Sequence, residues 1–157
     1  MSAALQDERT RLMRMVVQTH RHLSDTLGRE LQQAVGISPV FFDVLIHVAA
    51  APGGRLTMSR LSAEVALTKG GVTRLVDRMV GAGLVDRENS SKDRRSIQVV
   101  LTTAGREALT QAIAVHIESI ERHLFAPLND DDRASLVVAL TKILGRERVD
   151  DDVPRVG

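Results

Sequence analysis

Apolar residues recur at helical spacing through the N-terminal end of the chain. They follow mostly four- and seven-residue steps, with His20 filling one gap, at Leu5, Leu12, Val16, Leu23, Leu27 and Leu31. This pattern predicts one long helix over roughly residues 4–34 that ends at Gly36. A helix of that length extends about 45 Å, which is too long for one small domain to cover. It therefore needs a partner surface.

The C-terminal end carries two further apolar stripes. The first predicts a long helix that Thr102 caps and Pro127 breaks, with its stripe at Leu109, Ile113, His116, Ile120 and Leu124. The second predicts a last helix, capped by Asn129 or Asp130, with an apolar side of Leu136, Val137, Leu140, Ile143 and Leu144. Because the helices at both ends carry stripes that they cannot bury alone, a two-fold dimer is the natural solution.

A shorter helix opens the central region. Ser38 is placed to cap it, Pro39 suits its first position, and Ile37 is spaced to pack against Phe42 as a hydrophobic staple. The helix is predicted to end at residues 51–54, which read Ala-Pro-Gly-Gly, and residues 55–57 favour a short strand.

Two amphipathic helices follow. Thr57 or Ser59 caps the first, which runs through Val65; residues 66–67 make a turn, and Thr68 caps the second. One arc of the second helix is apolar, at Val72, Leu75, Val76 and Met79. The opposite arc carries Gly70, Thr73, Arg74, Asp77 and Arg78, with Lys69 at its edge. This is a helix-turn-helix pattern whose second helix has a cationic face.

A basic β-hairpin comes directly after this pattern. The stop at residues 81–83 leads into strands predicted over residues 84–88 and 97–101, joined by a turn that presents Lys92, Arg94 and Arg95. A helix that fits one DNA groove, beside a basic hairpin that fits the neighbouring groove, is typical of a protein that binds duplex DNA. The expected fold class is mainly α with a small β-hairpin (α+β).

The consecutive glycines Gly70 and Gly71 weaken the first turn of the second helix, at about 1 kcal/mol each. Such a cost indicates a close approach of the backbone to something bulky. An exposed helix start where helix propensity matters little would give the same sequence, and the residues do not separate the two explanations.

The composition mainly excludes certain kinds of binding site. The 157 residues, 43% of them hydrophobic, suffice for one domain with extensions. Three Phe without Trp or Tyr leave no stacking platforms for single-stranded nucleic acid, and the absence of cysteine removes disulfides and thiolate metal sites. Residues 38–102 hold nine Lys and Arg against six acids, whereas residues 103–157 hold seven against ten. The centre is thus the part that attracts phosphate.

Other classes of protein lack their signatures here. The charged N-terminus lacks the apolar core of a secretory signal peptide, and the longest apolar stretch, residues 44–51, is too short to span a bilayer. We expect a cytoplasmic protein without membrane contact. No Gly-rich phosphate loop follows a strand and no elbow-type Ser occurs, so we expect no enzyme and no cofactor. The histidine spacings, among them His20 with His22 and His116 with His123, give no expected metal site.

The order of elements and the residues together resemble the MarR (multiple antibiotic resistance regulator) family of winged-helix transcription factors. Residues 61–68 resemble its helix-turn-helix entry, and residues 72–79 with 83–85 its recognition helix and exit. Asp93-Arg94-Arg95 ahead of Leu101-Thr102 and Gly105 is similar to its wing signature. The chain departs from the family pattern at Gly70-Gly71, which replaces small polar residues, and in having no cysteine for oxidant sensing.

The resemblance implies a winged helix-turn-helix flanked by long N- and C-terminal dimerisation helices. The predicted divisions are an N-terminal dimerisation helix (1–37), a DNA-binding domain (38–102), C-terminal dimerisation helices (103–148) and a tail without fixed structure (149–157). The function implied is that of a homodimeric repressor on an inverted-repeat operator in double-stranded DNA. Family members are commonly relieved by a small aromatic or anionic effector. Residues that could line its cleft, none of them assigned, are His20, Arg21, Phe41, Phe42 and His47.

Individual roles follow from side-chain chemistry. Arg74 suits the guanine edge, with a phosphate contact or a pair with Asp77 as alternatives, and Asp77 is expected to brace Arg74. Arg95, and with it Arg94, suits a narrow minor groove, although such a loop can also be a solvated hairpin tip. The full set of predicted DNA-contacting residues is Ser62, Thr68, Lys69, Gly70, Thr73, Arg74, Arg78, Lys92, Asp93, Arg94 and Arg95.

Two other functions fit the same pattern. An architectural DNA-binding protein without ligand control would bind unrelated duplexes with similar affinity. A winged-helix protein-interaction module would bind no duplex through Arg95.

Overall fold

The structure is a computed structural model, and it describes residues 7–89 and 96–145. The helices are α2 (Glu8–Val35), α3 (Pro39–Ala50), α4 (Met58–Glu64), α5 (Lys69–Gly81), α6 (Thr103–Ile120) and α7 (Asp130–Leu144). The strands are β1 (Arg55–Thr57), β2 (Val85–Asn89) and β3 (Ile97–Leu101), and short 3₁₀ and π-helical turns span Pro52–Gly54 and Glu121–Phe125. The prediction of a mainly α fold with a small antiparallel sheet is confirmed.

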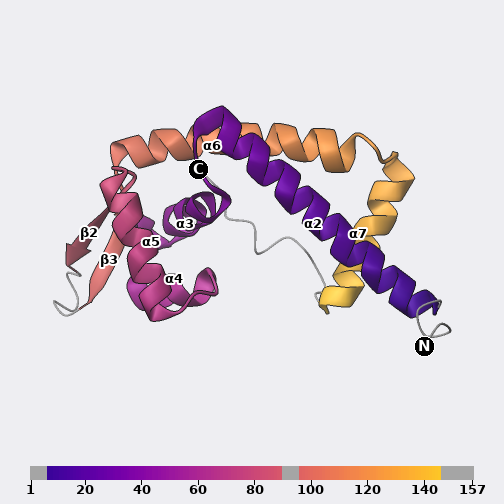
Figure 1. Ribbon diagram of the computed structural model, residues 1–157, viewed down its shortest axis with the longest axis horizontal. Helices are drawn as coiled ribbons and strands as arrows, with labels where there is room; N and C mark the ends of the chain where they lie inside the picture. Colours follow the sequence, from indigo (N-terminus) through magenta and orange to yellow (C-terminus); the bar gives the residue numbers. More distant parts are fainter. Residues whose placement is uncertain (1–6, 90–95, 146–157) are drawn as a thin grey trace.

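The helices and strands form two lobes that α2 and α6 connect (Figure 1). One lobe contains α3, α4, α5 and the sheet. The other contains the N-terminal half of α2, the end of α6 and α7 (Figure 1). Since α2 packs against α6, the two long helices set the position of one lobe relative to the other.

The core lies within the first lobe. The sheet is antiparallel in the order β1-β3-β2, with Leu56 and Arg87 both paired to Val99 of the central strand. Its apolar side chains pack with α3, α4 and α5, and the fully buried residues include Val44, Leu45, Val48, Leu61, Val72, Val76, Met79, Val85 and Val99. Nearly all of these are aliphatic, as the scarcity of aromatic residues requires.

Side-chain caps fix the helix starts. Ser38, Thr68 and Thr102 each accept a hydrogen bond from a backbone N–H three residues on, as predicted. Where the sequence left two candidates, Thr57 caps α4, and Asn129 caps α7 in a reciprocal capping box with Asp132.

Two element starts differ from the sequence prediction, and the end of α6 has a geometry that the sequence did not predict. The first described helix begins at Glu8 and not near residue 4, because Asp7 is extended and caps it; Leu5 lies outside the described residues. Strand β2 begins one residue later than predicted. Helix α6 continues into the π-helical turn before Pro127, where Arg133 donates to the Phe125 carbonyl oxygen at 2.9 Å. The tail from residue 146 lies outside the described residues.

Two helices leave apolar side chains uncovered. The N-terminal half of α2 exposes Leu12, Met13, Met15, Val16 and Val17. No residue of α7 is buried, and its exposed apolar residues are Leu136, Val137, Val138, Leu140, Ile143 and Leu144. Burying these surfaces would be favourable at about 25 cal/mol per Å². The exposed α7 surface contains all five apolar residues that the sequence predicts, whereas only Leu12 and Val16 of the described apolar residues in the predicted α2 stripe are exposed and Leu31 is buried within the chain.

Among the described residues, no single helix has the length and apolarity needed to cross a membrane. Helices α2 and α3 meet those two criteria only as a pair, bent by 83° at the break between them.

The end of the hairpin is locked to the start of α6. Thr102 donates through its hydroxyl to the Gly83 carbonyl oxygen at 2.7 Å and accepts from the Gly105 N–H at 2.8 Å. A Cβ at Gly105 would overlap the carbonyl oxygen of Leu84. The Leu-Thr-x-x-Gly sequence at residues 101–105 therefore has a physical reason: a buried apolar anchor, a cap, and a glycine that admits the neighbouring backbone.

We expect Gly105→Ala to lower the free energy of unfolding by about 2–3 kcal/mol, because backbone and not a flexible side chain must move. Gly70→Ala is the matched control: nothing lies near its Cβ, and better helix propensity should raise stability by about 0.5–1 kcal/mol. Urea unfolding at one protein concentration measures both. Equal effects of the two variants would contradict the close approach at Gly105.

Candidate nucleic-acid interface

Helix α5 has one buried and one exposed arc. Val72, Val76 and Met79 are at most 1% exposed and Leu75 is 5% exposed, whereas the predicted polar arc, residues 70, 73, 74, 77 and 78, faces outward. The assignment of the two arcs from periodicity is confirmed. Because α4 and β2 pack against α5, the polar arc is presented on a fixed support.

The turn between α4 and α5 is held by local contacts. Ala66 adopts a left-handed φ of 50°, an uncommon conformation for a residue with a Cβ. The Ser62 hydroxyl donates to the Leu67 carbonyl oxygen at 2.5 Å. The proton of Ser62 is thus used within the turn, so its hydroxyl is left as an acceptor.

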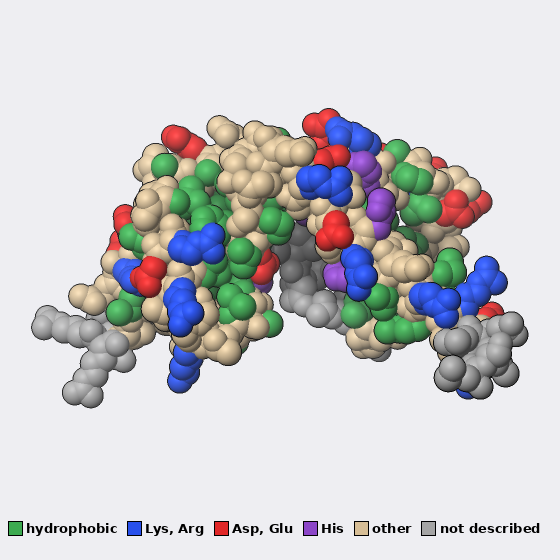
Figure 2. Space-filling model, in the orientation of Figure 1, with side chains coloured by type: hydrophobic (Ala, Val, Ile, Leu, Met, Phe, Trp, Pro, Cys, Tyr) green, Lys and Arg blue, Asp and Glu red, His purple; other side chains and the backbone are tan. Residues whose placement is uncertain are grey.

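The cations of this lobe fall into two groups. Arg55, Arg60 and Arg87 form salt bridges with Glu88, Glu64 and Asp77. Lys69, Arg74 and Arg78, all on α5, form none with any residue that the structure describes. Figure 2 shows Lys and Arg side chains along the outer face and lower tip of this lobe. The uncompensated positive charge of the described lobe therefore follows one helix.

The uncharged residues of the predicted set have local roles. Thr68 caps α5 through the Gly71 N–H, and the Thr73 hydroxyl donates to the Lys69 carbonyl oxygen at 2.9 Å. Nothing lies within 4 Å of a Cβ placed on Gly70. No close contact with the described residues therefore requires a glycine there, and the two explanations that the sequence left open remain.

The predicted pairing of Asp77 with Arg74 is wrong. The Asp77 carboxylate lies 2.6 Å from Nη1 of Arg87, a residue of β2. Sequence proximity favoured Arg74, three residues away on the same helix, whereas the fold brings a strand residue against Asp77. The role of Arg87 was missed because no local pattern marks it.

The hairpin lies beside α5, with β2 packed against it. The predicted wing residues Lys92, Asp93, Arg94 and Arg95 lie outside the described residues, so their roles stay predictions.

Arg78 differs from the other free cations of α5. Its guanidinium carbon lies 5.3 Å from the centre of the Phe41 ring, a cation–π geometry between α5 and α3. The next residue, Phe42, is buried and packs against the His116 ring at 4.9 Å. The first turn of α3 thus contacts α5 on one side and α6 on the other.

A pocket of about 270 Å³ lies between α2, α3 and α6. Its α2 side is mainly apolar, and Pro39, Phe42 and His116 close it. Of the five residues considered for an effector cleft, His20 and Phe42 line this pocket; Phe41 lies under Arg78, and His47 lies 3.4 Å from Asp43. Burial lowers the pKa of the His116 imidazole below its usual value.

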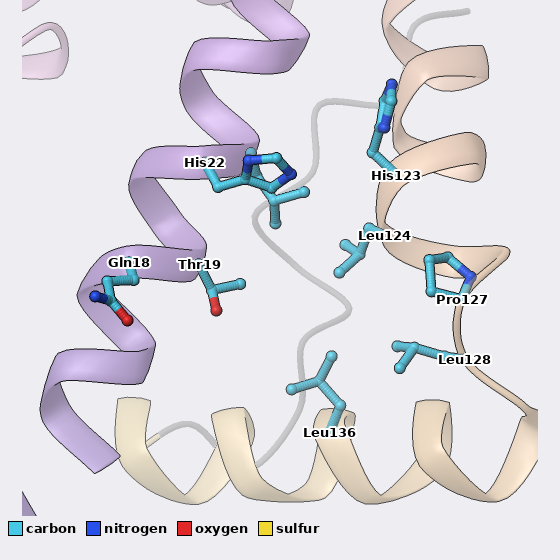
Figure 3. A pocket seen from close by; sticks show the side chains of 9 residues that line it. Gln18, Thr19, His22, His123, Leu124, Pro127, Leu128 and Leu136 are labelled. Carbon is cyan, nitrogen blue, oxygen red and sulfur yellow. The ribbon is translucent and has the colours of Figure 1, made fainter. Parts of the chain in front are cut away.

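A second, more open hollow of about 450 Å³ lies between α2, the end of α6 and α7. In Figure 3, His22 and His123 lie at one end of this groove, and Leu124, Leu128 and Leu136 line the rest. It continues the uncovered apolar surfaces of α2 and α7 and is separate from the polar arc of α5. Within residues 7–89 and 96–145, no group of three His, Cys, Asp or Glu side chains has the arrangement of a metal site.

Comparisons with known proteins agree with this geometry. A family model described as MarR family matches residues 35–96. The multiple antibiotic resistance protein MarR of Escherichia coli K12 is 30% identical over 134 residues, which cover 85% of this chain and 89% of that protein. The transcriptional repressor YetL of Bacillus subtilis is 28% identical over 117 residues, covering 74% of this chain and 70% of that protein.

A solved structure extends the agreement to three dimensions. Sco3205 from Streptomyces coelicolor, a MarR family transcriptional regulator solved in complex with DNA, superposes with a TM-score of 0.76 at 26% identity. The match covers 94% of this chain and 97% of that one. The winged-helix fold predicted from the sequence is confirmed.

The pocket histidine generates a pH prediction. Because the folded imidazole of His116 takes up a proton less readily than the unfolded one, stability should fall as the pH drops through the ordinary histidine value of about 6.5. We expect wild type to lose more stability than His116→Phe between pH 7.5 and 5.5 in urea unfolding. The other titrating groups are common to both proteins and cancel, so equal losses would contradict the burial of His116.

Proposed function

The chain belongs to the MarR family of transcriptional regulators, and from this membership we propose that it is a homodimeric repressor. In this proposal it binds an inverted repeat in double-stranded DNA and releases it when a small aromatic or anionic molecule binds. Its family consists of regulators and not of enzymes.

The observation that carries the proposal is the arrangement of α5. Its apolar arc is buried, and its opposite arc carries Lys69, Arg74 and Arg78, the cations of the described lobe that are free of salt bridges. A helix of this kind fits the major groove of B-DNA, and guanidinium groups match the acceptors of guanine. The DNA complex of Sco3205, a structural relative, supports the same use of the fold.

We assign roles within the proposed interface by chemistry. Arg74 would contact a base edge or a phosphate, and Lys69 a phosphate. Arg95, with Arg94 beside it, would enter the minor groove from the wing, with Asp93 shaping the turn. Ser62, Thr68, Gly70, Thr73, Arg78 and Lys92 complete the proposed set.

The uncovered helices support the dimer. Exposed apolar residues on α2 and α7 form surfaces that a second copy of the chain would bury. A two-fold axis through such an interface presents two copies of α5, and half-sites about 34 Å apart in an inverted repeat would match them. In this division, residues 1–37 and 103–148 dimerise, residues 38–102 bind DNA, and residues 149–157 form a tail.

The pocket between α2, α3 and α6 is our candidate for the effector site. Its apolar wall and the imidazoles of His20 and His116 suit a small aromatic or anionic molecule. Such a molecule could relieve binding only if it prefers a spacing of the dimer's two DNA-binding lobes that does not fit the half-sites of the DNA. Because α2 and α6 link the lobes, the pocket lies where that spacing is set.

Selection of duplexes from a random pool by the purified full-length chain tests the proposed function. We expect enrichment of an inverted repeat that binds at least about 10³-fold tighter than a scrambled duplex of the same composition. Equal binding of all duplexes would indicate an architectural protein, and binding of none a protein-interaction module. Either outcome would refute the proposal.

We predict that Arg74→Ala and Arg95→Ala each weaken binding of the selected duplex by about 1–3 kcal/mol. The matched control is Arg29→Ala, which removes the same charge from an exposed position on α2. Gel-shift titration at fixed salt measures all three. Losses no larger than that of Arg29→Ala would remove these residues from the interface.

We predict that Leu140→Glu combined with Ile143→Glu converts the dimer to monomers, because both side chains are exposed and apolar on α7 and would carry charge into the interface. Lys142→Glu places the same carboxylate where the helix already carries charge and should leave the dimer intact. Sedimentation velocity reports the molecular mass. A dimeric double variant would exclude α7 from the interface.

A further inference from the structure

Arg87 joins the hairpin to the recognition helix at two points. Its Nη1 atom lies 2.6 Å from the Asp77 carboxylate, and its Nη2 atom donates to the Thr73 carbonyl oxygen at 3.3 Å. Thr73 and Asp77 are four residues apart, about one turn of α5, and Arg87 belongs to β2. A single guanidinium therefore spans the surface between the two elements proposed to enter the DNA grooves.

Asp77 creates the need for such a contact. It is the one carboxylate in the sequence of α5, and it lies on the exposed arc with Arg74 and Arg78. Its side chain is 54% exposed, so an approaching phosphate would be repelled by an unpaired charge there. The Arg87 guanidinium supplies the opposite charge at hydrogen-bond distance.

The geometry also separates Arg87 from the cations that would hold phosphates. Lys69 and Arg74 form no salt bridge with the described residues, whereas both terminal nitrogens of Arg87 have acceptors. A phosphate contact from Arg87 would have to share or break these bonds. The planar fork of arginine suits two fixed acceptors, a task for which lysine, a point charge on a flexible stem, is poorly suited.

We propose that Arg87 is a positioning residue for DNA recognition: it neutralises Asp77 and fixes the hairpin relative to α5. This rests on the proposed function, since the two elements must reach neighbouring grooves together. The turn that carries Lys92, Arg94 and Arg95 begins three residues after Arg87 in the sequence. Loss of the contact would therefore alter discrimination between sequences more than general attraction to DNA.

A double-mutant cycle tests the proposal with the duplex selected by wild type and its scrambled counterpart as probes. Arg87→Gln should weaken binding of the selected duplex about tenfold or more, because it leaves the Asp77 charge uncompensated. In an Asp77→Asn background the same change should cost less than about threefold. Arg87→Lys keeps the charge, so it should bind the scrambled duplex like wild type while the ratio of selected to scrambled affinity falls several-fold.

A direct phosphate contact would give a different result. Arg87→Gln would then cost the same affinity whether residue 77 is Asp or Asn, and the slope of log affinity against log salt would fall by about one per chain. That pair of outcomes would overturn the positioning role.

A measurement without DNA separates failure of this inference from failure of the proposed function. In hydrogen exchange on the free full-length protein, Arg87→Gln and Asp77→Asn should each speed exchange of the β2 amides, and the double variant should be no faster than the faster single variant. Unchanged exchange in the single variants would overturn the inference, even if the chain selects a duplex. If exchange is faster in the variants but the wild-type chain selects no duplex, the positioning contact of Arg87 stands and only the proposed function is refuted.

Discussion

Complete burial of one arc of α5 is the constraint on which the rest of the structure depends. Val76 and Met79 have no exposed surface, and Val72 and Leu75 have almost none, so the helix cannot rotate without exposing apolar area. The opposite arc is thereby fixed outward, and with it the cations that lack salt bridges. The caps at Thr68 and Thr102 and the close approach at Gly105 hold the neighbouring elements to the same core.

The long helices impose the second condition. Among the described residues α7 has none that is buried and half of α2 exposes apolar side chains, so these helices carry the surfaces that the proposed dimer would cover. The same helices connect to the winged-helix lobe through α6 and border the pocket closed by Phe42 and His116. In the proposed function, assembly, the spacing of the DNA-binding lobes and access to the pocket would therefore all depend on α2 and α6.

Local sequence rules predicted the features that depend on neighbours along the chain. The caps, the buried arc of α5 and the stripes of α2 and α7 all follow from spacing, and the structure reproduces them. The pairing of Asp77 with Arg87 could not be predicted, because a helix residue and a strand residue ten positions apart meet only after the hairpin folds back. No sequence signal marks the π-helical turn before Pro127 either. It depends on a contact between residues eight positions apart, in which Arg133 donates to the Phe125 carbonyl oxygen.

The proposed function requires two rigidly linked copies of α5 to bind the same side of a duplex. The most direct measurement is the affinity for the selected duplex after about five base pairs, half of a helical turn, are inserted between its half-sites. Affinity should fall to that of a scrambled duplex, because the second half-site is rotated to the opposite side of the DNA. Undiminished affinity would contradict it, since independent chains would tolerate the insertion.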